Sequence, residues 1–231
     1  MPVKPFGLTE NPFAAGHDRR FVCPSRKRDE AMALLRRHIA EGAPFIMVTG
    51  DPGIGKTSVV WEALGAPGLM AKVAFVTHSS LGRTGLLEAI CLQFGVAVAN
   101  PPVRNEMVAR LERHLCLLRS RGCAAVLVLD DAHGTESEQY EELWSLSEMK
   151  TEGRELMQIV LVGLPELDHR LARPDLERLR ERVAVHCRIL PFTPDETERY
   201  LHHRVTVAGG SGVSVFPSET CREIYRLSHG I

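Results

Sequence analysis

The residues whose types and spacing could do chemistry lie in two short segments. "GDPGIGKT" (50–57) has the spacing G-x-x-x-x-G-K-[ST], and "LVLDDAHG" (127–134) is an apolar run that ends on two aspartates. Glycines let a backbone curl so that its N–H groups face inward and bind phosphate oxygens. The lysine of such a loop brings positive charge to the phosphates, and the next hydroxyl is a ligand for Mg²⁺. The first segment therefore predicts a nucleotide site.

The predicted cofactors are ATP and Mg²⁺. We expect adenine because guanine-specific proteins of this class carry Asn-Lys-x-Asp, and this chain has no Asn-Lys dipeptide. Lys56 is predicted to reach the β- and γ-phosphates and to act in catalysis, and Thr57 to bind the metal. The predicted nucleotide-binding residues are Gly50, Asp51, Pro52, Gly53, Ile54, Gly55, Lys56, Thr57 and Ser58.

The two aspartates have different predicted roles. Asp130 ends a core strand, the position from which an acidic residue holds Mg²⁺ through its water shell in phosphate-loop proteins, although capping of the next helix is the alternative. Asp131 is predicted to be the general base that polarises the attacking water. The alternative for Asp131 is a solvated or capping carboxylate.

The elements that position these residues alternate between strand and helix. Apolar runs at 44–50, 72–77, 123–130, 156–163 and 183–190 predict buried strands, and helices are expected at 26–41, 56–64, 84–94, 104–120 and 137–150. This alternation indicates an α/β fold with a parallel sheet. Helices at 194–208 and 217–228 predict a small C-terminal subdomain. Trp61 and Trp144 are expected in the core.

Composition limits the function classes. The 231 residues carry a net charge of -1 and 44% hydrophobic residues, as in an ordinary soluble domain. No apolar run approaches the roughly 18 residues that cross a bilayer, and the N-terminus lacks a signal-like apolar region, so we expect a cytoplasmic location. The six cysteines form no C-x-x-C pair and are expected to be reduced. His202 and His203 have no ligand spacing nearby, so no zinc is predicted.

Six segments resemble, in order, the AAA+ ATPase domain of the general secretion pathway protein A family. They are "FGLTENPF" (6–13), the phosphate loop, "VLDDAH" (128–133), "IVLVGLPEL" (159–167), "LERLRERV" (176–183) and "IYRLSHGI" (224–231). The resemblance implies a P-loop NTPase core of AAA+ type, with five parallel strands in the order 5-1-4-3-2 and a helical lid. The domains would be an arm at 1–25, a core at 26–191 and a partial lid at 192–231.

The resemblance also implies partners and further site residues. It implies a homo-oligomer with ATP between subunits, and a membrane partner protein in envelope secretion machinery, whose assembly ATP hydrolysis energises or regulates. Arg182 falls where the family places an arginine that acts on a neighbour's γ-phosphate, although an ordinary surface arginine is the alternative. By the same matching, Phe13 would lie near the adenine; an apolar arm covering the core is the alternative.

Two departures from the family pattern predict slow turnover. The family has Glu where this chain has Asp131, and a polar Gln where this chain has Leu164. Misplacing a catalytic group by about 1 Å can cost on the order of a hundredfold in rate. The family also continues beyond "SHGI" (228–231) with Pro-Arg, so a fragment or a truncated gene product is expected, able to bind ATP but poor at assembly.

Two other functions stay open. A STAND-type signalling switch also ends its strand with "LDD" and turns over slowly. A transposition-type regulator on DNA is the third, because basic residues gather near the N-terminus: Arg19, Arg20, Arg26, Lys27, Arg28, Arg36 and Arg37. No aromatic residues are interleaved with them to stack bases, so a nucleic-acid partner is not expected, though not excluded.

Overall fold

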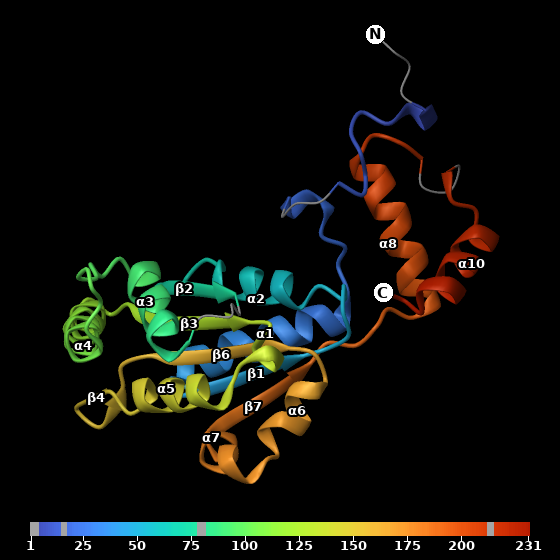
Figure 1. Ribbon diagram of the computed structural model, residues 1–231. Coiled ribbons are helices and arrows are strands. Elements are labelled where there is room, and N and C mark those ends of the chain that lie inside the picture. The colour runs from blue at the N-terminus through green and yellow to red at the C-terminus, as the bar shows by residue number, and fades with distance from the viewer. Residues whose placement is uncertain (1–4, 15–17, 78–81, 212–214) are drawn as a thin grey trace. The chain divides into compact units, whose positions relative to one another are not determined.

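The computed structural model describes residues 5–14, 18–77, 82–211 and 215–231 (Figure 1). The chain divides into two compact units. The sheet unit comprises residues 31–50 and 55–189, and the helical unit comprises residues 1–30, 51–54 and 190–231. The arm, core and lid boundaries given above stay predictions.

The sheet unit is built on five parallel strands. They are β1 (Phe45–Thr49), β2 (Ala71–Thr77), β3 (Ala124–Asp130), β6 (Gln158–Gly163) and β7 (Val183–Arg188), in the spatial order β2-β3-β6-β1-β7. Counted along the chain, this is 2-3-4-1-5. It is the predicted order 5-1-4-3-2 read from the opposite edge, so the predicted α/β fold and topology are confirmed.

Helices cover both faces of this sheet (Figure 1). Successive side chains of a strand point to opposite faces, and β1 shows this clearly: Phe45 and Met47 join one buried cluster, Ile46 and Val48 the other. The first cluster packs under α3 (Arg83–Phe94), α4 (Arg104–Ser120) and α5 (Ser137–Ser147). The second packs under α1 (Arg26–Glu41) and α2 (Lys56–Leu64). Because helices cover both faces of the sheet, the strands are apolar along nearly their whole length.

A fully buried carboxylate ties three of these helices together. Glu142 of α5 has an exposed fraction of 0% and accepts hydrogen bonds from Arg83 of α3 and Arg104 of α4. A buried carboxylate is tolerated only when it is paired and hydrogen-bonded, and two guanidinium groups meet that need here.

Several elements of the sheet unit were not predicted. A hairpin of β4 (Lys150–Thr151) and β5 (Arg154–Glu155) follows α5, and its two turn residues, Glu152 and Gly153, have φ of 52° and 74°. Left-handed conformations at both central residues are those of a type I′ turn. Between β6 and β7 lie α6 (Glu166–Leu171), η4 (Pro174–Leu176) and α7 (Glu177–Glu181).

Element boundaries and burial give two corrections. The helices predicted at 26–41 and 56–64 begin and end as expected, whereas α5 ends at Ser147, before the predicted residue 150. Trp61 is not in the core: it is 43% exposed, and its ring stacks on that of Phe75 with centroids 4.8 Å apart. Trp144 packs against the first cluster as expected.

The helical unit contains the helices α8 (Pro194–Val207) and α10 (Ser218–Ser228). A capping box begins α8, in which the Glu196 N–H donates to Thr193 Oγ1 at 3.3 Å and the Thr193 N–H donates to Glu196 Oε2 at 2.8 Å. Ser25 donates to the other carboxylate oxygen of Glu196 at 3.0 Å, which ties the N-terminal segment to α8.

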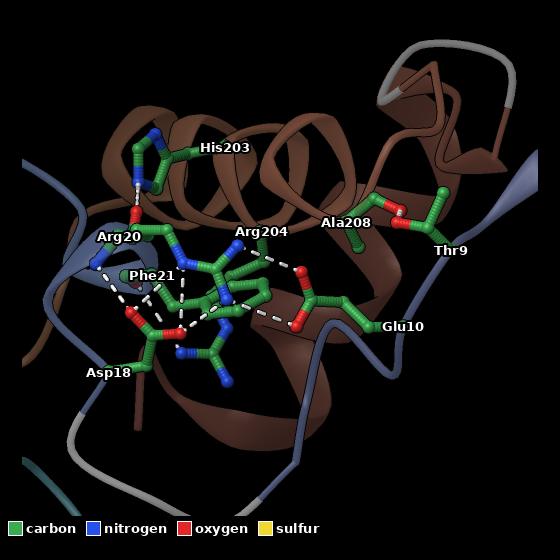
Figure 2. A network of polar contacts seen from close by, with 8 residues as sticks. All are labelled: Thr9, Glu10, Asp18, Arg20, Phe21, His203, Arg204 and Ala208. Atoms are coloured by element: carbon green, nitrogen blue, oxygen red, sulfur yellow. Dashed lines mark hydrogen bonds and ion pairs between the residues drawn. The ribbon is translucent and has the colours of Figure 1, made fainter.

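The N-terminal segment also contains η1 (Pro5–Gly7) and η2 (Arg19–Phe21), and it is fixed to the end of α8 by a polar network (Figure 2). The Thr9 N–H and hydroxyl both donate to the Ala208 carbonyl, at 2.8 and 2.9 Å. Arg20 lies between the carboxylates of Glu10 and Asp18, and its own carbonyl is 3.1 Å from a ring nitrogen of His203. The guanidinium of Arg20 lowers the pKa of Asp18.

Among the described residues, the structure contains no helix that is both long and apolar enough to span a bilayer. The six cysteines are free thiols: Cys23, Cys91, Cys187 and Cys221 are buried, and Cys116 and Cys123 are partly buried.

Candidate nucleotide site

The predicted phosphate loop joins β1 to α2, the strand-to-helix context that the motif requires. Gly53 and Gly55 adopt left-handed conformations, with φ of 76° and 88°. A side chain would be strained at both positions, so glycine is needed for this turn. Asp51–Ile54 group with the helical unit, and there the Ile54 N–H donates to the Asp51 carbonyl at 3.4 Å. Pro52 is exposed, and Ser58 lies on α2.

Lys56 is buried at the first position of α2, with an exposed fraction of 8%. Its Nζ donates to the Gly50 carbonyl at 3.0 Å, so the side chain folds back over the loop rather than into solvent. A buried ammonium beside a helix N-terminus, which carries partial positive charge, creates a local potential that favours an anion.

Thr57 and Asp130 are brought together although 73 residues separate them in the sequence. The Thr57 hydroxyl donates to Asp130 Oδ2 at 2.8 Å. Asp130 is the last residue of β3, and β3 lies two strands from β1, with β6 between them. Hydroxyl and carboxylate oxygens are the hard ligands that Mg²⁺ prefers. This donor set fits the predicted metal.

Asp131 occupies a turn in an unusual conformation. It has φ 54° and ψ 34° and caps η3 (Ala132–Gly134), its N–H donates to Asp130 Oδ1 at 3.0 Å, and the residue is exposed. Left-handed backbone is uncommon for a residue other than glycine, and aspartate is among those that tolerate it. The turn directs the two carboxylates differently: Asp130 toward Thr57, and Asp131 outward.

Tyr140 of α5 holds this turn in place by a hydrogen bond. Its hydroxyl donates to the Ala132 carbonyl at 2.6 Å, and the side chain is fully buried. Burial raises the pKa of Tyr140 to about 12, so the hydroxyl keeps its proton and remains a donor at neutral pH. Sequence reasoning did not identify this residue, because a tyrosine on an apolar helix face is typical of core.

The end of β6 lies close against the same turn. A side chain at Gly163 would come within 3.2 Å of the His133 backbone nitrogen, so glycine permits this approach. The Leu164 N–H is 3.5 Å from His133 Nδ1, and Arg170 donates to the His133 carbonyl at 3.3 Å. Leu164 itself offers no side-chain hydrogen bond, as its residue type predicted.

Thr49, the residue before Gly50 of the loop, is held by a series of side-chain contacts that the sequence did not reveal. Thr49, fully buried at the end of β1, has its hydroxyl 2.7 Å from His186 Nε2, and His186 Nδ1 is 3.4 Å from Asp168 Oδ1. His186 comes from β7 and Asp168 from α6. The signal in the sequence was a histidine that interrupts the apolar residues of this strand, Val183, Ala184, Val185 and Cys187.

Arg182 lies at the other end of the sheet. It precedes β7, whose first residue pairs with Phe45 at the start of β1, whereas the loop follows the end of β1. Its guanidinium donates to Ser147 Oγ at 2.9 Å, to Glu155 at 3.0 Å and to Glu148, and its side chain is only 15% exposed. It also lies over the Trp144 ring, 5.3 Å from the centroid. These contacts favour a structural role, and the action on a neighbouring subunit stays a prediction.

Phe13 belongs to the helical unit. Its ring lies 6.5 Å from Tyr200 and 6.0 Å from Phe216, centroid to centroid, and it is 43% exposed. The Phe13 N–H donates to the Asn11 side chain at 2.9 Å, which fixes the Asn-Pro-Phe turn. Its predicted contact with adenine stays a prediction.

Most of the basic residues near the N-terminus have partners. Arg20 binds Asp18 and Glu10, Arg26 binds Glu30 at 2.7 Å, and Lys27 lies 3.8 Å from Glu196. In the sheet unit, Arg37 lies 3.6 Å from Glu41. Paired cations leave little net charge for phosphates, so these contacts give no support to a nucleic-acid surface.

The fold and the loop together define a class of protein. Five parallel strands in the order 5-1-4-3-2, with G-x-x-x-x-G-K-T after the first strand and an acidic residue ending the third, make a P-loop domain of AAA+ type. The chain belongs to the family described as "AAA domain", whose model matches residues 37–171.

The similar proteins agree with this class. The chain is 29% identical over 226 residues to general secretion pathway protein A of Aeromonas hydrophila; the match covers 98% of the chain but about two fifths (41%) of that relative. Among solved structures, Cdc6p from Pyrobaculum aerophilum has a TM-score of 0.69 at 20% identity, covering 90% of this chain and 57% of that one. ORC2 of Aeropyrum pernix, solved as ADPNP–ADP complexes, has a TM-score of 0.64 at 20% identity, covering 83% and 55%. At such identities the structures are evidence of the fold alone.

Proposed function

We propose that this chain binds ATP together with Mg²⁺ and hydrolyses it. The observation that carries the proposal is the 2.8 Å contact between the Thr57 hydroxyl and Asp130, next to buried Lys56 at the start of α2. Two oxygen ligands and a cation at the end of a glycine-rich turn match the chemistry of a triphosphate with its metal.

Each residue of the loop then has a physical role. Backbone N–H groups of the loop and the N-terminus of α2 bind phosphate oxygens, because a glycine-rich turn and the positive end of a helix both attract anions. Lys56 exchanges its contact with the Gly50 carbonyl for phosphate oxygens. Thr57 and Asp130 hold the metal, which when bound neutralises charge on the β- and γ-phosphates.

Asp131 is the proposed general base. Asp131 is exposed on a left-handed turn, so its carboxylate can accept a proton from a water. Aspartate is one methylene shorter than the family's glutamate. We infer that its carboxylate stands farther from the water, so that hydrolysis is slow.

The partner in the cell is proposed from the similarity to general secretion pathway protein A. We propose that nucleotide-dependent homo-oligomers of this chain energise or regulate the assembly of envelope secretion machinery through a membrane partner protein. Arg182 is the candidate for an arginine that acts on a neighbour's γ-phosphate, and its internal contacts with Ser147 and Glu155 argue against that role.

A second candidate function is a nucleotide-held switch of the STAND type. The short Asp131 and the apolar Leu164 favour it, because both lower the expected hydrolysis rate without removing any group that binds phosphate. A slow ATPase would keep its nucleotide and signal by conformation. Turnover number separates the two functions, since nucleotide binding is common to both.

The test of nucleotide binding is Lys56→Ala. Ligand-induced stabilisation follows RT ln(1 + [L]/Kd), about 2.7 kcal/mol at a hundred times Kd, so the parent should melt at a clearly higher temperature in Mg-ATP. We expect Lys56→Ala to lose this gain. The matched control is Lys72→Ala, which removes an exposed lysine from β2 and should keep it. Equal gains in Lys56→Ala and parent would contradict the proposal.

A further inference from the structure

The helical unit contains a cluster of metal-ligating side chains that lies apart in sequence from the nucleotide site. Glu198 and His202 lie on α8 and Cys221 lies on α10, and one ligand atom from each falls within 4.8 Å of the other two. Glu198 and His202 are four residues apart, so they lie on the same helix face, one turn from each other. Cys221 is buried, with an exposed fraction of 1%.

We propose that Glu198, His202 and Cys221 form a binding site for a divalent cation of the zinc class, which joins α8 to α10. Thiolate, imidazole and carboxylate are the three side-chain ligands that Zn²⁺ takes in proteins. A harder cation such as Mg²⁺ disfavours sulfur, so the donor set selects against the metal proposed for the nucleotide site.

The spacing of the donor atoms fits a tetrahedral ion. Cys221 Sγ lies 3.8 Å from His202 Nε2. Ordinary Zn–S and Zn–N bond lengths place the sulfur and nitrogen ligands of one tetrahedral ion about 3.6 Å apart. The two atoms are therefore close to the separation they would have as ligands, before any side chain rotates.

A backbone carbonyl oxygen next to this cluster could serve as a fourth metal ligand. The Phe216 carbonyl oxygen is 2.8 Å from His202 Nε2 and 3.4 Å from Cys221 Sγ. Without metal, these contacts are hydrogen bonds that the ring N–H and the thiol donate. With metal, the proton of His202 moves to Nδ1, the thiol releases its proton to solvent, and the carbonyl is positioned to complete the coordination.

A hydrogen bond from α10 holds the Glu198 carboxylate in place. Ser218 donates to Glu198 Oε1 at 2.7 Å, from the first turn of α10. An outer hydrogen bond of this kind orients a carboxylate ligand and is a common support for metal ligands.

The test uses the full chain, freed of metal by a chelator and titrated with Co²⁺. We expect one Co²⁺ per chain and a near-ultraviolet thiolate-to-cobalt charge-transfer band, which Zn²⁺ then removes by displacement. Cobalt at the nucleotide site would give no such band, because Thr57 and Asp130 supply only oxygen. The result does not depend on ATP binding, so its failure and that of the proposed function are distinguishable.

Variants assign the ligands. Cys221→Ser should abolish the band, and His202→Gln should weaken Co²⁺ binding by at least about tenfold. The matched controls are Cys123→Ser and His203→Gln; His203, the next residue on α8, is 3.1 Å from the Arg20 carbonyl rather than in the cluster. If buried Cys221→Ser fails to fold by circular dichroism, His202→Gln decides. The absence of a band in the parent, or a band that survives Cys221→Ser or disappears equally in Cys123→Ser, would overturn the proposal.

Discussion

The two ends of the parallel sheet use charged side chains in different ways. At the carboxyl end, Thr57 and Asp130 contact each other, and Asp131 is exposed on a left-handed turn. At the amino end, Arg182 is enclosed by Ser147, Glu155 and the ring of Trp144. The first end offers unused ligand capacity in a strained turn, which is typical of functional sites. The second satisfies its charge internally, which is typical of structural support.

Changes at the carboxyl end should lower activity and spare stability. Asp130→Asn should reduce ATP turnover by about 10- to 100-fold, the loss that is typical when a group that holds a metal through its outer shell is removed. The melting temperature without nucleotide should change little, since the carboxamide oxygen of the new side chain still accepts the Thr57 hydrogen bond. Parallel assays of turnover and melting test this. A variant with normal turnover would remove Asp130 from the metal site.

The opposite pattern is expected at the amino end. Arg182→Ala should lower the free energy of unfolding by about 2–4 kcal/mol, because it leaves Glu155 and Ser147 without their guanidinium partner. Arg178→Ala, an exposed arginine of α7, is the matched control and should stay within about 0.5 kcal/mol of the parent. Denaturant unfolding measures both.

Turnover of Arg182→Ala decides between its two roles. Measured well below the melting temperature, it should equal that of the parent if the residue is structural. A loss on the order of a thousandfold with normal stability would instead identify Arg182 as the residue that acts on a neighbour's phosphate.

The residues at the carboxyl end could be predicted because the motifs that specify them are contiguous in the sequence. A contiguous motif specifies the loop, and a strand that ends on Asp130 needs only the parallel topology to meet Thr57. The five strands and most helices followed from apolar periodicity. The metal and catalytic roles stay predictions, because a sequence pattern gives positions and not occupancy.

The amino end was missed because its contacts are assembled from distant segments. Glu155 reaches Arg182 from the β4–β5 hairpin, whose strands are two residues long and charged, with Glu-Gly at the turn as the only signal. At the carboxyl end, too, one contact was missed for the same reason: the Thr49–His186 contact spans 137 residues. Glu198, His202 and Cys221 are likewise spread over two helices, so no short spacing marked them, and the sequence predicted no zinc.

A third change concerns Tyr140, which supports the turn that contains Asp131. The pKa of Tyr140 is raised to about 12 in the folded protein by burial, against an ordinary value near 10. Between these two values the unfolded chain binds fewer protons, so the folded state loses stability as pH rises, by up to about 1.4 kcal/mol per unit. Tyr140→Phe removes this dependence and also leaves the Ala132 carbonyl without its donor. The difference between parent and Tyr140→Phe in unfolding free energy should therefore shrink from pH 9 toward pH 12; a constant difference would contradict the buried-donor role.

The smallest change concerns Asp131, the second of the two aspartates. If it is a general base held too far from the water, Asp131→Glu should raise kcat severalfold while ATP affinity stays nearly unchanged, the signature of an interaction made in the transition state. Asp131→Asn should remove the residual turnover, again without weaker binding, because its backbone N–H to Asp130 is kept. Both substitutions keep a polar side chain at an exposed left-handed position, so stability should differ by less than about 1 kcal/mol. Single-turnover kinetics and the Mg-ATP melting shift measure the two quantities separately. An Asp131→Glu variant no faster than the parent would mean that Asp131 is not the base. The carboxyl end would then bind nucleotide without efficient hydrolysis, and the nucleotide-held switch would become the better account of this chain.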